Sequence, residues 1–299
     1  MCQDVSHLRC QHELRNAGAS CRPSLDSARG CRYGPGVFAD PEEQAILKGI
    51  DHLVVIVPEL EAAIASYRGL GFTVVPGGRH PIGTHNALIA FADGSYLELI
   101  AFFEPNPQHR WYQRLQQGGG LIDFCLQTDD LAGDVRALRD AGVAIADPRP
   151  LSRVRPDGYE LRWVLSIPET DGGVAPFLIE DETPRVERVP RTTTHSNGAT
   201  GIRLVTVAVS DVSRVRRWFE RASGAMVATT ERDDLAASGA RVTVGPHVLD
   251  FVAPRSATSP LASWLAARGP SPYAASLAAS RGGGPLPVDG TLGARLTLG

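Results

Sequence analysis

The chain repeats one pattern of apolar residues three times, and this repeat constrains its fold more than any other feature of the sequence. In each copy an apolar run, which is rich in β-branched residues in the first copy, is followed by a helical stripe, a glycine and a second apolar run. The interval from Leu60, where the first stripe begins, to Gly71 equals the interval from Leu131 to Gly142 in the second copy. The copies begin at residues 50, 121 and 202. A chain of this kind is expected to fold as repeated strand, helix, strand units.

Each copy continues with two further strand candidates joined by a turn. In the first copy the turn is Ala92–Ser95, which contains a glycine and suits a hairpin. The strand candidates, in order, are 86–91 with 96–102, 160–167 with 175–180, and 240–244 with 248–252. Each unit therefore reads βαβββ, and the sequence predicts an α+β fold.

A damaged fourth copy follows the third. Residues 272–280 lie where the next first strand is due, and Gly293–Gly299 echoes Gly239–Gly245. The spacing predicts a unit that lacks its helix and ends before its last strand. Its open sheet edge favours burial by a neighbour or a partner chain, so a homodimer is an expectation.

Composition limits the partners and the domain plan. The 33 acidic residues outnumber the 30 basic ones, which argues against nucleic acid. No apolar run is long enough to span a membrane and the start is too polar for a signal peptide, so we expect a cytoplasmic protein. Four of the five cysteines lie in the first 31 residues at spacings that match no zinc module. We expect a disordered segment at 1–47, a domain of two units at 48–186 and a second domain at 187–299.

Four local sequences carry a resemblance to a known family. They are IDHLVV, GGRHP-x-GTHNAL, DGSYLELI and H-x-NG, within residues 50 to about 210. The chain resembles bacterial glyoxalase-like domain proteins of the vicinal oxygen chelate superfamily, which also contains glyoxalase I, extradiol dioxygenases and bleomycin-resistance proteins. The resemblance implies tandem βαβββ modules, three complete and a fourth truncated, whose paired sheets curl into a cup.

The resemblance also implies metal ligands on the first and fourth strands of two paired units. In the first unit these positions hold His52 and Glu98. In the second unit the first position holds Asp123, a departure from the usual histidine, and the other falls on Leu178 or Glu180, of which only Glu180 can bind a metal. The predicted metal ligands are therefore His52, Glu98, Asp123 and Glu180.

Two functional classes stay open. One imidazole and three carboxylates form an oxygen-rich site that suits Mg, Mn or Fe(II) better than Zn, with Ni also a candidate. Such a site would serve a metal-dependent lyase, isomerase or dioxygenase acting on a small molecule. In the alternative, His52 and Glu98 are hydrogen-bond partners in a metal-free binding pocket, which the departure at Asp123 favours.

Further candidates lie beside these positions. As general acids or bases we consider Glu98, His80 and His85, the two histidines being alternatively turn stabilisers. The resemblance suggests that the linker carrying H-x-NG folds toward the first cup. The expected substrate contacts are Arg79, Asn86, Tyr96, His195 and Asn197.

Overall fold

The computed structural model describes residues 47–222 and 225–299. The segment expected to be disordered, 1–47, lies outside these residues except for its last position. None of the helices in the described ranges is long and apolar enough to cross a membrane.

Module one, residues 47–102, has the predicted order of elements. Helix α1 begins at Leu60 because the Glu59 side chain accepts hydrogen bonds from the backbone N–H groups of Glu61 and Ala62. The chain leaves the helix at Gly71, whose φ of 86° suits a residue without a side chain. The elements are β1 Leu47–Ile56, α1 Leu60–Gly69, β2 Val75–Arg79, β3 Thr84–Ala90 and β4 Tyr96–Phe102.

Module two, residues 120–181, repeats this order after the short helix α2 at Tyr112–Gln116. The Asp130 side chain caps its helix by accepting from the Gly133 N–H. Helix α4, Arg185–Arg188, follows the module. The elements of the module are β5 Gly120–Thr128, α3 Leu131–Asp140, β6 Arg149–Val154, β7 Glu160–Ser166 and β8 Phe177–Asp181.

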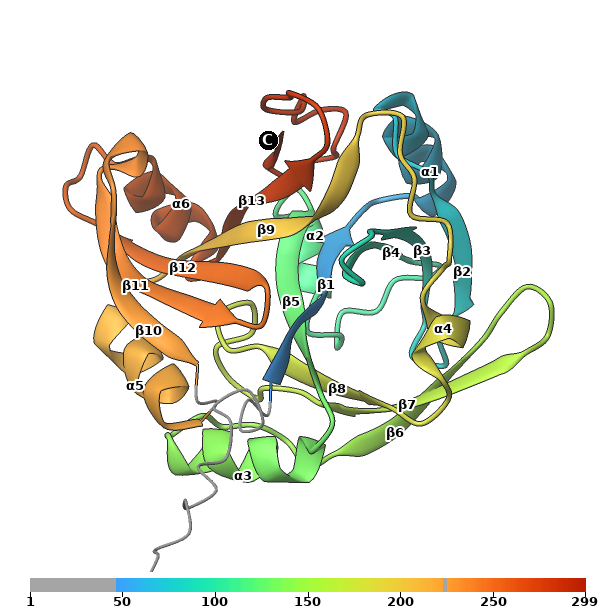
Figure 1. The fold of residues 1–299 in the computed structure, drawn as a ribbon, viewed down its shortest axis with the longest axis horizontal. Coiled ribbons are helices and arrows are strands. Elements are labelled where there is room, and N and C mark those ends of the chain that lie inside the picture. Colours follow the sequence, from blue (N-terminus) through green and yellow to red (C-terminus); the bar gives the residue numbers. More distant parts are fainter. Residues whose placement is uncertain (1–46, 223–224) are drawn as a thin grey trace, which may run out of the picture. The chain divides into compact units, whose positions relative to one another are not determined.

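The two modules close one barrel (Figure 1). Its strand order is β1-β4-β3-β2-β6-β7-β8-β5. Strand β1 pairs in parallel with β4 and antiparallel with β5, and β5 pairs in parallel with β8. On the other side, β2 and β6 meet at the pair Arg79 and Val154. The inner faces of both modules therefore surround one space.

The third unit and the remnant of the fourth share a six-stranded sheet in the order β10-β11-β12-β9-β13-β14. The third unit's helix α5, Val212–Ala222, packs against its strands, and α6, Pro260–Arg268, leads into β13. The strands are β9 Ala199–Ala208, β10 Met226–Arg232, β11 Ala237–Val244, β12 His247–Pro254, β13 Ser271–Ala279 and β14 Leu296–Leu298.

The end of the chain differs from the expectation for the fourth unit. Strand β14 pairs in parallel with β13, as β4 does with β1 and β12 with β9. It therefore occupies the place of a last strand, although its sequence echoes a third strand. The missing parts are the helix and the two middle strands, since β13 runs through a loop directly into β14.

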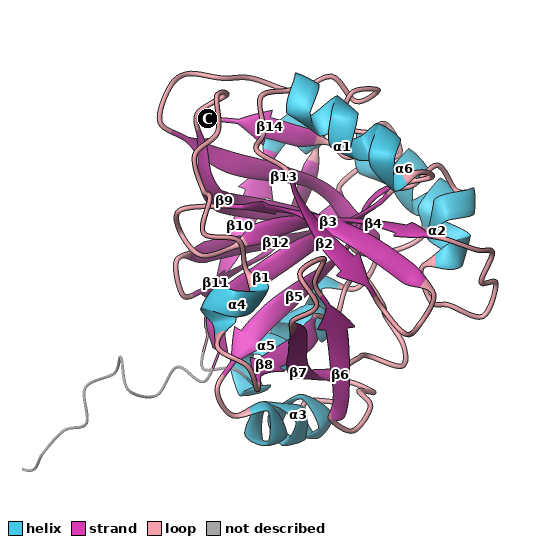
Figure 2. Cartoon of the chain, turned by 90° about the vertical axis from the view of Figure 1, so that its right-hand side faces the viewer, coloured by secondary structure: helices cyan, strands magenta, loops and turns pink. Residues whose placement is uncertain are grey.

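One apolar core joins the barrel to the second sheet. A continuous cluster of buried side chains extends from Leu47 to Leu298 and includes residues of α1, α3 and α5. Helices α3 and α5 also pack against each other (Figure 2). A separate cluster, which includes Val54, Cys125 and Phe177, lies inside the barrel.

Candidate functional site

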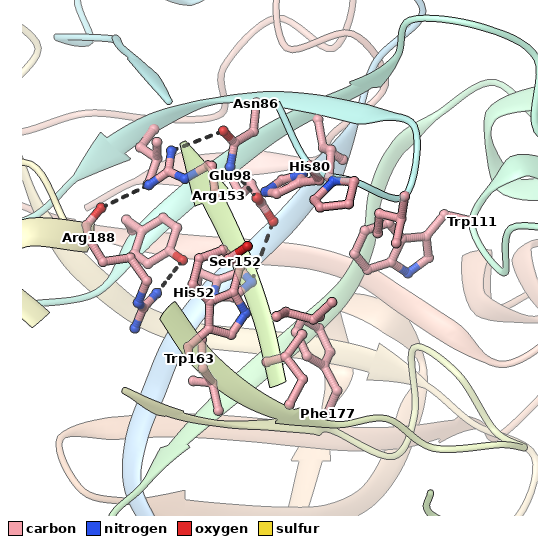
Figure 3. A pocket seen from close by; sticks show the side chains of 18 residues that line it. His52, His80, Asn86, Glu98, Trp111, Ser152, Arg153, Trp163, Phe177 and Arg188 are labelled. Atoms are coloured by element: carbon pink, nitrogen blue, oxygen red, sulfur yellow. Dashed lines mark hydrogen bonds and ion pairs between the residues drawn. The ribbon is translucent and has the colours of Figure 1, made fainter. Parts of the chain in front are cut away.

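A pocket opens inside the barrel, and its walls come from both modules (Figure 3). The empty space, with its open mouth included, is about 610 Å³. One part of the wall is apolar, and another carries polar groups. The apolar lining consists of Leu88, Ile100, Trp111, Leu151, Trp163, Leu165, Phe177 and Ile179. We call this space the barrel pocket.

His52 and Glu98 meet in the barrel pocket. His52 lies opposite Tyr96 in the pairing of β1 with β4, and Glu98 is two residues farther along β4 on the same face. The distance from His52 Nε2 to Glu98 Oε2 is 3.5 Å. The Tyr96 ring stacks on the imidazole with ring centres 4.7 Å apart, and the Phe177 ring meets its edge at 5.3 Å.

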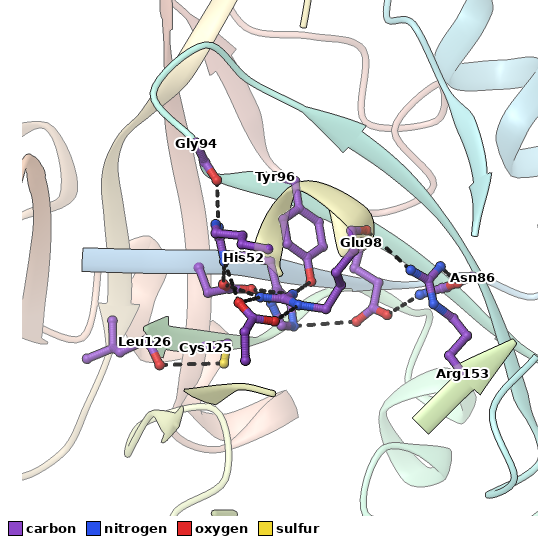
Figure 4. A network of polar contacts seen from close by, with 12 residues as sticks. His52, Asn86, Gly94, Tyr96, Glu98, Cys125, Leu126 and Arg153 are labelled. Carbon is purple, nitrogen blue, oxygen red and sulfur yellow. Dashed lines mark hydrogen bonds and ion pairs between the residues drawn. The ribbon is translucent and has the colours of Figure 1, made fainter. Parts of the chain in front are cut away.

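A buried ion network holds His52 from behind (Figure 4). The Asp51 carboxylate accepts hydrogen bonds from both terminal nitrogens of Arg188, at 3.0 and 2.8 Å, and from Arg185. Asp181 pairs with the same Arg188. Burial by itself raises the pKa of Asp51, but Arg188, His52 and Arg185 hold it well below its usual value.

This network fixes the tautomer of His52. An ionised carboxylate can only accept hydrogen bonds, so the contact of 2.6 Å between His52 Nδ1 and Asp51 Oδ1 places the proton on Nδ1. In the neutral ring, the lone pair of Nε2 then faces Glu98. Asp51 therefore orients the imidazole toward the pocket.

A second chain of contacts runs from Glu98 to Arg153. The Asn86 amide nitrogen donates to Glu98 Oε1 at 2.6 Å, and its oxygen accepts from Arg153 Nη1 at 3.2 Å. Arg153 Nη2 donates to the backbone oxygen of Arg188 at 3.3 Å. Burial lowers the pKa of Arg153, because a charged group is less stable in low-dielectric surroundings than in water.

His80 also lines the barrel pocket. Its Nδ1 lies 2.8 Å from the Thr84 hydroxyl, and the Trp163 ring meets it edge to face. Burial lowers the pKa of His80 to about 4, so the ring is neutral at pH 7. It could accept or donate one hydrogen bond to a bound molecule.

The two expected ligands from module two are not in the barrel pocket. Asp123 occupies the position in β5 that His52 has in β1. His52 pairs with Cys125, which lies two residues after Asp123, and Asp123 pairs with Val54, which lies two residues after His52. Its carboxylate, however, accepts from Trp111 Nε1 at 2.9 Å and pairs with Arg110 at 2.8 Å. The pairing of β1 with β5 shifts register beside Asp123.

Glu180 lies on the other face of β8. Phe177 and Ile179 point into the pocket, and side chains alternate along a strand, so Glu180 points outward. There its carboxylate accepts from the backbone N–H of Leu131, at the start of α3. Glu180 thus stabilises a helix end, and the expected set of four ligands does not assemble.

Four other candidates also lie outside the barrel pocket. Arg79 and His85 both pack on Phe103. His195 accepts from the Thr73 N–H and donates to the Ala90 oxygen, so both ring nitrogens hold the linker to module one. Asn197 similarly donates to the Leu70 oxygen. Of the expected substrate contacts, the structure brings Asn86 and Tyr96 into the pocket.

Sequence reasoning missed three charged residues of the site. Asp51 is a charge within an otherwise largely apolar strand, and that local signal could have identified it, whereas the sequence of β6, RPLSRV, does not distinguish Arg153. Arg188 lies in the linker after module two, where its sequence gives no hint of burial. Only the three-dimensional fold brings it to Asp51.

These residues fit a resident divalent ion poorly. Ligand atoms of Asp51, His52 and Cys125 lie within 4.8 Å of one another. Two guanidinium groups already neutralise Asp51, and His52 Nδ1 donates to the same carboxylate, so both of these ligand candidates are already engaged. His52 Nε2 and Glu98 remain as one adjacent pair, whereas protein metal sites commonly use three or four ligands.

Comparisons with known proteins agree with the observed modules. The sequence profile of a family described as glyoxalase-like domain matches residues 50–223. A hypothetical protein from Staphylococcus aureus is similar in structure, with a TM-score of 0.63, 17% identity, and coverage of 85% of this chain and 99% of that one. A triple mutant of 4-hydroxymandelate synthase from Streptomyces coelicolor is similar with a TM-score of 0.54, 14% identity, and coverage of 79% and 72%. At these identities the likeness shows the fold alone. Among curated protein sequences, none matches this chain.

Proposed function

We propose, for this chain that belongs to the family of glyoxalase-like domain proteins with the vicinal oxygen chelate fold, a function in binding. Its barrel binds a small organic molecule without a resident metal ion. The observation that carries this proposal is the composition of the barrel pocket. Aromatic and aliphatic side chains form most of its wall, and a few fixed polar groups interrupt it. This combination is typical of sites for small organic ligands.

The polar groups support binding because they are held in place before any ligand arrives. Asp51 fixes the His52 ring, and Asn86 fixes the Glu98 carboxylate on one side. Little side-chain freedom is then lost when a ligand makes hydrogen bonds to them. The same two acid–base groups could also move a proton on a bound molecule, but binding is the function that the geometry supports best.

The four tryptophans of the chain provide the test. Trp111 and Trp163 line the barrel pocket, whereas Trp218 lies on α5 and Trp264 on α6. Their indole N–H signals can be followed in nitrogen–proton correlation spectra while benzamide, benzyl alcohol and toluene are added as uncharged probes. Assignment uses single Trp→Phe variants.

We expect at least one probe to shift the Trp111 or Trp163 signal in a saturable way. The Trp218 and Trp264 signals should stay in place, which makes them internal controls. The proposal fails if no probe shifts either pocket signal up to its solubility limit, or if all four signals move together without saturation.

A further inference from the structure

We infer that the molecule bound in the barrel pocket carries a carboxylate on an apolar or aromatic body, and that Arg153 binds this carboxylate. The inference rests on the proposed function, because it names the ligand class of the same pocket. Its basis is that the guanidinium group of Arg153 is buried and forms no ion pair within the described part of the chain.

Arg153 is 3% exposed, yet its hydrogen bonds go to neutral oxygens. Both are long, at 3.2 Å to the Asn86 amide and 3.3 Å to the Arg188 backbone. Within residues 47–222 and 225–299, no carboxylate forms an ion pair with it. A buried charge with such partners is costly, and burial lowers the pKa of this side chain accordingly.

The neighbouring guanidinium groups differ in this respect. Arg188 pairs with Asp51 and Asp181, and Arg185 pairs with Asp51. These charges are neutralised inside the protein and need no ligand. Among its hydrogen bonds within the described residues, Arg153 instead connects to a carboxylate, that of Glu98, only through the neutral Asn86 amide.

The position of Arg153 gives a ligand access to it. It lines the barrel pocket, at the end of the polar chain that begins at His52. A carboxylate of a bound molecule would contact Arg153 from within this pocket. The rest of the ligand would then lie against the apolar wall around Trp163 and Phe177.

A carboxylate fits this site better than an uncharged polar group. A planar guanidinium can bind both carboxylate oxygens, and charge-assisted hydrogen bonds of this kind are roughly twice as strong as neutral ones. In a buried site, salt screens such a pair much less than it screens a surface pair. The ligand charge would offset the cost of burying Arg153.

The test compares benzoate with benzamide, which have nearly the same shape and differ in charge. Both are titrated into the full-length protein at pH 7, with the Trp163 indole signal as the readout. We expect benzoate to bind at least about tenfold more tightly, the equivalent of about 1.4 kcal/mol. Arg153→Gln should remove this preference and leave benzamide binding in place, and Arg153→Lys should restore part of it.

Arg79→Gln is the matched control, because it also removes one positive charge but from a side chain outside the pocket. It should keep the preference for benzoate. The inference is overturned if benzamide binds as tightly as benzoate to the unmodified protein, or if the preference survives in Arg153→Gln. Absence of binding by both compounds and by the other uncharged probes would instead reject the proposed function itself.

Discussion

Among single residues, Asp51 links the site to the linker that follows module two. Its buried carboxylate contacts His52, Arg188 and Arg185 at once. Removal of one member of a buried ion network leaves its partners uncompensated, which typically costs about 3–5 kcal/mol. We therefore expect Asp51→Asn to lower the melting temperature strongly.

Asp157→Asn serves as the control for this prediction. Asp157 also pairs with an arginine, Arg155, but on the exposed surface, so its loss should barely change the melting temperature. Thermal unfolding followed by circular dichroism measures both variants. Equal melting temperatures for Asp51→Asn and Asp157→Asn would contradict the role given to Asp51.

Asp134 makes the stability of the protein depend on pH. It is buried on α3, and within the described part of the chain neither carboxylate oxygen has a well-oriented hydrogen bond. Burial raises its pKa to about 6 from 3.8, although the nearby Thr128 hydroxyl lowers it in part. The folded state therefore holds this proton more tightly than the unfolded state, so its contribution to stability falls as pH rises from about 4 to about 6.

Asp134→Asn removes this ionisation while keeping the shape of the side chain. We expect the variant to be more stable than the original protein at pH 8, by on the order of 3 kcal/mol, and the difference to shrink toward pH 4. Urea denaturation at both pH values measures the change. A gain of the same size at both would show that ionisation of Asp134 is not its cause.

Two candidate ligands show how far residue spacing can be trusted. The spacing correctly placed Asp123 at the strand position equivalent to His52. It could not show that Trp111 and Arg110, from the segment between the modules, would bind its carboxylate. Glu180 was expected on the inner face of its strand together with Leu178, but Phe177 and Ile179 occupy that face inside the barrel.

At the scale of elements, strand β2 approaches the polar wall closely enough to require a glycine. A Cβ at Gly77 would lie 2.0 Å from the Asn86 side-chain oxygen and 2.3 Å from Arg153 Nη1. Gly77→Ala should therefore displace both side chains and destabilise the protein by about 1–3 kcal/mol. It should also weaken the binding of benzoate.

Gly69→Ala is the matched substitution, because a Cβ at the end of α1 meets nothing within 4 Å. Alanine there should leave stability unchanged or raise it by up to about 1 kcal/mol. Denaturant titration gives both free energies of unfolding. If Gly77→Ala matched Gly69→Ala in its free energy of unfolding and in benzoate binding, the close approach of β2 would contribute neither to stability nor to binding.

The elements themselves were largely predictable, because apolar spacing and helix ends are local signals. Helices α1 and α3 begin at Leu60 and Leu131, where the apolar stripes predicted them. Strand β2 continues through the two glycines of GGRHP, and its pairing with β3 shifts register at Gly77 and resumes at Gly78 and Arg79. The place of β14 was also missed, because sheet order depends on distant pairing and not on local sequence.

For the whole molecule, the shared apolar core predicts cooperative unfolding. The cluster that contains Tyr67 of α1 also contains Phe219 of α5 and Leu277 of β13. Loss of either sheet would expose apolar surface on the other. We expect the indole signals of Trp163, in the barrel, and Trp218, on α5, to disappear at the same urea concentration. Two separate midpoints would mean that the halves unfold independently.

Metal addition tests the binding proposal for the intact protein. An ion that binds only the folded state stabilises it by about 2.7 kcal/mol at a hundredfold excess over its dissociation constant. Because His52 and Glu98 offer one adjacent pair of ligands, we expect melting temperatures to agree with EDTA and with Mn(II), Fe(II), Ni(II), Mg(II) or Zn(II). A rise with one ion that Glu98→Gln abolishes would instead support a metal site.

The wall that the barrel pocket shares with a groove beside α4 has a consequence for the rate of ligand exchange. Leu88, Arg153 and Arg188 form the wall between the barrel pocket and the outer groove beside α4. Passage through that wall would displace the buried Arg153 and Arg188 from their hydrogen bonds, whereas the pocket is also lined by His80, Pro81 and the exposed Ile82, which form its rim. We therefore expect a ligand to enter and leave the pocket past this rim. A substitution that makes the rim more rigid would lengthen the residence time of the ligand while changing its affinity little.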